Sequence, residues 1–315
     1  MRYRHTRLLA VIAVAGLVTA PIAVTASASA ATAPLSDARV VAHFASSALQ
    51  NPENITLQPG GAADVTFTRA RQIAQIGTDG SVSILATLPA PATGTATASG
   101  IVRAPDGSLY VNYNAGSQSG IWRVPPGGGT AVEVAALPDV KVINGLAIDD
   151  GEDALYATDS TTGTVWKIAL KSGTASVWAQ GTDLEPATVN SSGLGANGIK
   201  VHDGAVWVSN TDKGTLLRIP IGPHGTAGAA TTVATGLTAI DDFAFTGDGD
   251  TVVAALDYAN EVALIQPDGT HQIVLTAADG IENPTSIAVR GSTVYVASGA
   301  YFTHADPNLL LAKLG

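Results

Sequence analysis

Six residues with oxygen-bearing side chains recur along this chain at similar intervals, each two residues before an apolar run. Successive members lie 46, 45, 53, 44 and 44 residues apart, and none of them is basic or apolar. One such residue would be typical of a turn, whereas six equivalent ones indicate a shared role. These slot residues are Glu53, Ser99, Asn144, Asn197, Asp241 and Thr285.

The chemistry that the slot residues could support is the binding of a hard cation. Glu53 and Asp241 are carboxylates, and Asn144 and Asn197 are amides. Oxygen donors of this kind suit Ca²⁺, and Mg²⁺ or Mn²⁺ less well. Zinc would require histidine or cysteine, and no slot holds either residue. We therefore expect a divalent metal, calcium in the first place, as the cofactor.

The residues after each slot predict the elements that position it. A short strand leads through a Gly/Asp turn, such as 105–107, to a second strand with alternating apolar residues, such as 155–160. A third strand comes next, and in most repeats a fourth. Repeats of about 40–50 residues made of several short strands are typical of propeller blades. The sequence thus predicts an all-β fold, a six-bladed β-propeller of four-stranded antiparallel blades.

The first strand of each propeller blade lines the central axis, so we expect the slot residues just before these strands, at one mouth of the channel. The sixth repeat lacks a fourth strand, and residues 39–44 have the alternation to supply it. We expect this N-terminal strand to close the ring, which removes an exposed sheet edge. A polar insertion, 183–195, accounts for the one spacing of 53 residues.

The loops between second and third strands should open on the same face as the slots and form the walls of a pocket. We expect a small-molecule substrate or ligand there. His304 is the one histidine expected at this mouth, whereas His202 and His224 fall in turns elsewhere. The predicted substrate contacts are Ser99, Tyr113, Asp159, Asn210, Tyr258, Thr285, Tyr301 and His304.

The N-terminus and the composition indicate where the chain works. Residues 1–30 combine arginines, an apolar run and the sequence Ala28-Ser29-Ala30, which is the pattern of a cleavable secretory signal. Residues 31–315 would then form a single propeller domain. The net charge of −10 argues against a nucleic-acid partner, and no later apolar run has membrane-spanning length. We expect a secreted protein without disulfides, because the chain has no cysteine, and a monomer, because the ring is closed.

The chain resembles the regucalcin/gluconolactonase/luciferin-regenerating-enzyme family of six-bladed propellers. The resemblance rests on NPENITL around Glu53, INGLAID around Asn144, ANGIKVHDG around Asn197 and IDDFAFTGDG around Asp241, in the family's order. It implies that these four residues hold one divalent metal, commonly calcium. It further implies that Asp241 acts as base or nucleophile in the hydrolysis of a lactone or related ester.

Two motifs depart from the family pattern. The family often has Glu-Gly-Pro at the first slot, where this chain has Glu53-Asn54-Ile55, and the run DDFAF is atypical of sugar lactonases. These motifs are similar to a branch that contains fungal hetero-Diels–Alderase propellers, which guide a cyclisation. Three functions therefore stay open: a metal-dependent hydrolase of lactonase type, a ligand-binding or scaffold propeller, and a cyclase-like enzyme.

Overall fold

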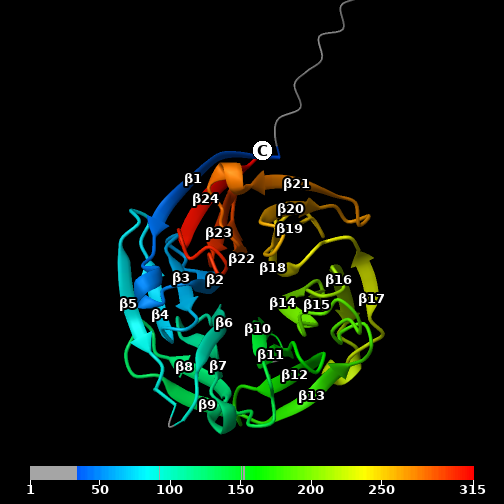
Figure 1. Cartoon of the computed structure of the whole chain (residues 1–315). Helices are drawn as coiled ribbons and strands as arrows, with labels where there is room; N and C mark the ends of the chain where they lie inside the picture. Colours follow the sequence, from blue (N-terminus) through cyan, green and yellow to red (C-terminus); the bar gives the residue numbers. More distant parts are fainter. Residues whose placement is uncertain (1–33, 92, 150, 152) are drawn as a thin grey trace, which may run out of the picture. The chain divides into compact units, whose positions relative to one another are not determined.

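A computed structural model describes residues 34–315 except 92, 150 and 152, and these described residues form one compact unit. This unit contains six four-stranded antiparallel sheets arranged as a ring (Figure 1). The predicted six-bladed β-propeller is therefore confirmed. The predicted signal peptide, residues 1–30, lies outside the described residues.

Each blade begins with an inner strand at the centre of the ring and ends with an outer strand at its rim (Figure 1). Blade 1 consists of β2 (Pro52–Leu57), β3 (Ala63–Phe67), β4 (Gln72–Ile76) and β5 (Val82–Thr87). Blade 2 consists of β6 (Thr97–Arg103), β7 (Leu109–Asn114), β8 (Gly120–Val124) and β9 (Val132–Ala136). Blade 3 consists of β10 (Ile143–Asp149), β11 (Ala154–Asp159), β12 (Thr164–Ala169) and β13 (Ala175–Gln180). Blade 4 consists of β14 (Ala196–His202), β15 (Ala205–Asn210), β16 (Thr215–Pro220) and β17 (Thr231–Ala234). Blade 5 consists of β18 (Ile240–Phe245), β19 (Val252–Leu256), β20 (Glu261–Ile265) and β21 (His271–Thr276).

Blade 6 is built from both ends of the described chain. Its strands are β22 (Pro284–Arg290), β23 (Thr293–Ser298), β24 (Asn308–Leu314) and, as the outer strand, β1 (Leu35–His43). β1 pairs antiparallel with β24 and has two register shifts. The expected closure by an N-terminal strand is present, and the strand is longer than the predicted 39–44.

Apolar side chains from neighbouring blades form the core. Ile121 of blade 2 packs with Leu146 and Leu155 of blade 3, and Ile73 of blade 1 packs with Val111 of blade 2. Strand alternation supplies these faces, because every second side chain points to the same side of a sheet. Burial of apolar surface between the sheets therefore holds the ring together in a chain that has no cysteine.

Helices are short in the part of the chain that the structure describes. They are four 3₁₀ turns, η1 (Ser46–Ala48), η2 (Gly116–Gln118), η3 (Pro223–Gly225) and η4 (Ala277–Asp279). No helix among the described residues has the length and apolar character needed to cross a membrane.

All six slot residues lie inside irregularities of the inner strands. Each inner strand shifts register with its neighbour at the slot, as between Ile143 and Leu146 in β10 and between Ile240 and Phe243 in β18. A bulge of this kind redirects the side chains that it contains. The slots were expected just before the strands, and this was wrong: each is the second residue of its strand, or the third in β6.

Candidate active site

The pairing of the first two strands in each blade fixes which loops surround the slots. Ile143, the residue before slot Asn144, pairs with Asp159 at the end of β11. Ala196, before slot Asn197, pairs with Asn210 at the end of β15 in the same way. The loops after the second strands therefore open on the slot face, as the sequence predicted.

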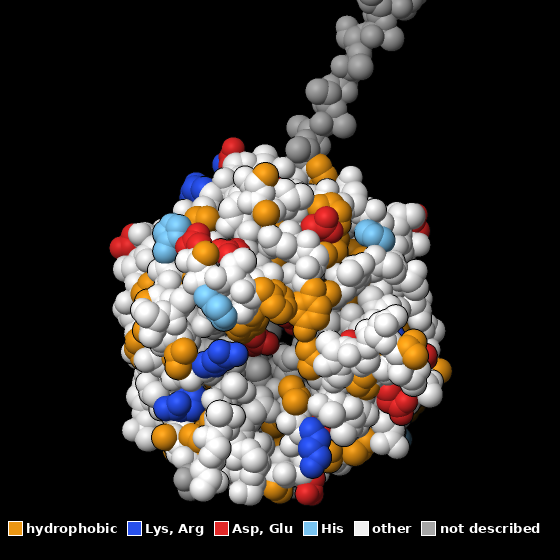
Figure 2. All heavy atoms as spheres, viewed as in Figure 1, with side chains coloured by type: hydrophobic (Ala, Val, Ile, Leu, Met, Phe, Trp, Pro, Cys, Tyr) orange, Lys and Arg blue, Asp and Glu red, His pale blue; other side chains and the backbone are white. Residues whose placement is uncertain are grey.

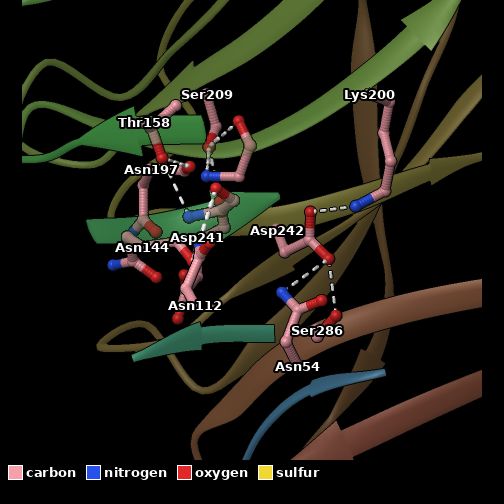
Figure 3. A network of polar contacts seen from close by, with 12 residues as sticks. Asn54, Asn112, Asn144, Thr158, Asn197, Lys200, Ser209, Asp241, Asp242 and Ser286 are labelled. Atoms are coloured by element: carbon pink, nitrogen blue, oxygen red, sulfur yellow. Dashed lines mark hydrogen bonds and ion pairs between the residues drawn. The ribbon is translucent and has the colours of Figure 1, made fainter. Parts of the chain in front are cut away.

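Side-chain hydrogen bonds from one blade to the next hold the slot backbone. In four blades a polar residue of the second strand donates to the slot carbonyl of the following blade. Thr158, for example, donates to the Asn197 carbonyl at 2.6 Å and accepts the amide of Gly145 at 2.8 Å (Figure 3). The four bonds are Thr66 to Ser99 at 2.7 Å, Asn112 to Asn144 at 2.8 Å, Thr158 to Asn197 at 2.6 Å and Ser209 to Asp241 at 2.5 Å.

The residue after each slot packs against the next blade, and in three blades it is glycine. A Cβ atom on Gly145 would lie 2.4 Å from the Asn197 carbonyl oxygen, and one on Gly100 would lie 2.5 Å from the Asn144 carbonyl oxygen. No side chain fits there, which explains the repeated polar–Gly pairs. The other three blades place Asn54, Asp242 and Ser286 at this position.

The side chains of Asn54 and Ser286 meet the carboxylate of Asp242 at the axis. Asn54 donates to it at 3.3 Å, Ser286 at 2.5 Å, and the ammonium of Lys200 lies 2.5 Å from its other oxygen (Figure 3). Asp242 is fully buried, so the pairing offsets the cost of burying its charge. We call Asp242 with its partners Asn54, Ser286 and Lys200 the clamp. Sequence reasoning missed it, although a lysine between two apolar residues of the inner strand ANGIKVH was a signal for it.

A second group of carboxyls lies on the slot side of this clamp. Burial raises the pKa of Glu53 to about 6; the Asp242 charge adds to the rise, and a hydrogen bond from Tyr301 opposes it. Burial, then the charges of Glu53 and Asp257, hold the pKa of Asp241 well above its usual range. Burial and the charge of Glu53 raise the pKa of Asp257 to about 7. The three carboxyls are thus close enough to repel one another.

Within the described residues, no ion pair joins the acidic group of Glu53, Asp241 and Asp257 to a lysine, arginine or histidine. The Oδ1 atoms of Asn197 and Asp257 are buried and have no hydrogen-bond partner in the part of the chain that the structure describes. The donors present, carboxylates and amide oxygens, are those that a hard divalent cation prefers.

The acidic group is not arranged as a closed chelate. In the described part of the chain, the carboxyl oxygens of Glu53, Asp241 and Asp257 do not all lie within 4.8 Å of one another. At least one of these side chains must therefore rotate before all three could share an ion. Among the predicted metal ligands, Asn197 donates its amide to Thr211 at 2.8 Å, and Asn144 is buried beside it (Figure 3).

Asp257 departs from the pattern of blades 2, 3 and 4. Its counterparts Asn114, Ser160 and Thr211 each donate to a carbonyl just before the next slot, at 2.7–2.8 Å. An ionised carboxylate cannot donate, so Asp257 in its ionised form cannot join neighbouring blades in this way. Comparing this position across the repeats of the sequence would have shown Asp257 as its one carboxylate, beside Thr68, Asn114, Ser160, Thr211 and Gly299.

The side chains of two other slot residues form hydrogen bonds to backbone carbonyls. Ser99 donates to the Ile143 carbonyl at 2.6 Å, and Thr285 donates to the Pro52 carbonyl at 3.1 Å. Both side chains are buried, and each joins its blade to the next one. The structure therefore places them in the frame of the site, whereas the sequence predicted substrate contacts.

Three of the predicted wall residues also point into the protein. Tyr113 is buried against Trp122 and donates to the Pro89 carbonyl, because alternation turns it away from the face that carries Asn112. Asp159 accepts backbone amides from Lys141 and Val142, each at 3.2 Å.

Asn210, the third, donates to the carbonyls of Asp183 and Glu185 at 2.8 and 2.9 Å. It thereby holds the insertion 183–195 against the blade. The sequence predicted that Tyr113, Asp159 and Asn210 contact the substrate at the mouth. The structure instead places all three side chains inside the protein, where they support the backbone.

The remaining predicted residues lie towards solvent on the slot face. Tyr301 donates to Glu53 and is partly exposed. Tyr258 is 47% exposed and forms an edge-to-face pair with Phe302, which is 61% exposed, at 5.2 Å between ring centroids. His304 is exposed. Figure 2 shows a hollow near the middle of this face, with acidic side chains inside it and hydrophobic side chains on its rim.

Solved structures with a similar fold include several propeller enzymes. A putative gluconolactonase matches with a TM-score of 0.67 and 17% identity over 88% of this chain and 92% of that one. A gluconolactonase from Xanthomonas campestris matches with a TM-score of 0.67 and 15% identity over 90% and 92%. A catalytically inactive virginiamycin B lyase from Staphylococcus aureus, solved with quinupristin, has a TM-score of 0.60 and 18% identity over 84% and 80%. These likenesses show the fold.

In sequence, the comparison with curated proteins found no match. A family model described as a repeat of unknown function (DUF6923) matches residues 61–241, which is more than half of the chain. The match begins in blade 1 and ends at slot Asp241 of blade 5. The chain therefore belongs to the family of proteins with this repeat of unknown function (DUF6923).

Proposed function

We propose that this propeller is a metal-dependent hydrolase of lactonase or esterase type, with its active site at the acidic end of the central channel. One observation carries the proposal. The Glu53 charge raises the pKa of both Asp241 and Asp257, the Asp257 charge adds to the rise at Asp241, and none of the three carboxyls has a basic partner among the described residues. Perturbed carboxyls gathered in a hollow mark candidate functional sites.

The residues present fit a divalent cation, calcium in the first place. Glu53, Asn197 and Asp241 would hold it, and Asn144 and Asp257 stand beside them as further oxygen donors. The unpartnered Oδ1 atoms of Asn197 and Asp257 support this fit, because a buried acceptor without a partner is costly. When bound, such a cation polarises a carbonyl oxygen as a Lewis acid.

The protein's own groups would carry the proton. The Asp241 carboxylate would accept a proton from water as the water oxygen attacks the lactone carbonyl carbon. The proton would then pass to the ring oxygen as the acyl–oxygen bond breaks, which leaves a hydroxy acid. Tyr301 would keep Glu53 oriented through its hydrogen bond. The uncharged amides of Asn144 and Asn197 would orient the substrate without adding charge.

The choice of a lactone follows from the family resemblance and from the two gluconolactonase-like structural neighbours. A lactone panel tests it: hydrolysis with calcium is expected for the unmodified chain, and a loss of about 10²–10⁴-fold for Asp241→Asn. Asp139→Asn, which changes an exposed carboxylate, serves as the matched control. Equal rates for the Asp241→Asn and Asp139→Asn variants would refute the proposed role of Asp241.

The alternative is a propeller that does not hydrolyse its ligand, either a binding protein or a cyclase-like enzyme. The exposed pair of Tyr258 and Phe302 favours it, because aromatic rings at a mouth offer a surface to an apolar ligand. Binding of aromatic lactones without turnover, weakened in Phe302→Ala, would support this alternative over the hydrolase.

We further propose that the protein acts outside the cell as a monomer, after cleavage near Ala30, on a small molecule. Mass spectrometry of the exported protein and its mass in solution test these points. An uncleaved N-terminus would refute the signal peptide, and a stable dimer would refute the monomer.

A further inference from the structure

A second cluster of metal-ligating side chains lies at the other end of the inner strands. His202 is the last residue of β14, whereas slot Asn197 is its second residue. The two residues are five positions apart on an extended strand, which is a distance of about 17 Å. Asp203 follows His202 in the turn to β15, and Asp250 lies in the turn between β18 and β19 of the next blade. The cluster therefore belongs to neither the acidic group nor its mouth.

The ligand atoms of the cluster converge. His202 Nε2 lies 3.2 Å from an Asp250 oxygen and 3.6 Å from an Asp203 oxygen, and all three atoms lie within 4.8 Å of one another. His202 Nε2 is nevertheless buried without a hydrogen bond. The ring nitrogen therefore faces two carboxylates without a hydrogen bond to either of them.

The spacing suits ligands around a common ion. Zinc binds histidine nitrogen and carboxylate oxygen at about 2.0–2.2 Å in tetrahedral sites, which puts neighbouring ligand atoms about 3.3–3.6 Å apart. The distances of 3.2 and 3.6 Å bracket that range. One imidazole and two carboxylates also form a softer set than the all-oxygen donors of the slot face.

The histidine ring is held in place. It stacks on Phe245, with centroids 3.7 Å apart and an interplanar angle of 18°, and its edge meets Trp207 at 6.4 Å. Its side chain is 23% exposed, so the ring is accessible only in part. Asp203 takes a left-handed backbone conformation, with φ of 44°, which directs the turn beside the ring. A ligand held by packing loses little freedom on binding an ion.

We propose that His202, Asp203 and Asp250 bind a divalent transition-metal ion, with zinc as the reference ion. Water would complete the coordination, because Asp203 and Asp250 are exposed at 77% and 39% of their side chains. The ion would join blade 4 to blade 5, since His202 and Asp203 belong to the one and Asp250 lies in the other. Its role would be to stabilise this blade interface, independently of the slot face.

Zinc titration of the purified, tag-free chain by calorimetry tests the proposal. We expect one zinc per chain and a higher melting temperature with zinc. His202→Gln and Asp250→Asn should each weaken zinc binding by at least about tenfold. Asp250 lies in an exposed turn, so its variant remains informative if His202→Gln folds poorly.

Two controls separate this site from the rest of the chain. His271→Gln changes an exposed histidine outside the cluster and should leave zinc binding unchanged. Asp241→Asn should also leave it unchanged, so a failure of the proposed hydrolase would not affect this result. Zinc affinity that is equal in the unmodified chain, His202→Gln and Asp250→Asn would overturn the proposal.

Discussion

Asn54 of blade 1 donates a hydrogen bond of 3.3 Å to Asp242 of blade 5, although 188 residues separate them in the chain. Ser286 of blade 6 and Lys200 of blade 4 contact the same carboxylate. Four consecutive blades therefore meet on one buried side chain at the axis. This contact spans the place where the two ends of the chain close the ring.

Asp242→Ala should destabilise the propeller by about 3 kcal/mol, because it leaves the buried partners of the carboxylate unsatisfied. Urea denaturation of the variant measures the loss. Lys200→Met should cost at least as much, because it leaves the buried Asp242 carboxylate without its counter-ion. A loss below about 0.5 kcal/mol for Asp242→Ala would show that the clamp does not hold the ring.

Gly145→Ala should destabilise the fold by about 1–3 kcal/mol, because its Cβ atom would lie 2.4 Å from the Asn197 carbonyl oxygen. Gly60→Ala is the matched control, since nothing lies within 4 Å of its added Cβ atom. Thermal unfolding of both variants gives the comparison. Equal melting temperatures would mean that the blades can move apart at the slots.

Thr158→Val should cost about 1–3 kcal/mol and weaken calcium binding. It removes the hydroxyl that joins the Gly145 amide to the Asn197 carbonyl, and slot Asn197 depends on that backbone. Thr232→Val, on an exposed outer strand, is the control. Unchanged calcium affinity in Thr158→Val would contradict the prediction, because it would show that this hydroxyl does not position Asn197 for calcium binding.

The stability of the metal-free protein should fall as pH rises from about 4 to about 7. The pKa of Asp257 is about 7 in the folded chain, against an ordinary 3.8, so the folded state binds more protons in that window. The stabilising contribution of protonated Asp257 is therefore complete below pH 3.8 and is lost as pH rises through about 7.

One such group changes the free energy of unfolding by at most about 1.4 kcal/mol per pH unit. Unfolding in the presence of a chelator, at several pH values, measures the slope. Asp257→Asn should reduce it, and calcium should flatten it in the unmodified chain. An identical slope in Asp257→Asn and the unmodified chain would contradict the raised pKa.

The fold could be predicted from the sequence because each repeat carries the same order of slot, turn and alternating strands. Periodicity located the slots, but it could not show that they lie in strand irregularities, which depend on pairing with the second strand. The alternation of apolar residues along a strand could also not predict the direction in which the side chains of Tyr113 and Asp159 point. Whether such a side chain faces the mouth or the neighbouring blade depends on the packing of the whole ring.

The clamp at Asp242 was beyond sequence reasoning for a different reason. Asn54, Asp242 and Ser286 stand where other blades have glycine, and each alone is typical of a turn. Only the closed ring brings them onto one point together with Lys200. His202, expected in a turn, instead ends a strand and stacks on Phe245 for a similar reason.

The most direct test of the proposed metal site is the metal content and calcium-dependent melting temperature of the purified chain beside Asp241→Asn. We predict one calcium ion per chain at the slots and a rise in melting temperature that shrinks in the variant. No bound calcium, and no shift in either protein, would contradict the metal-dependent hydrolase and leave the ligand-binding or cyclase-like propeller as the better account.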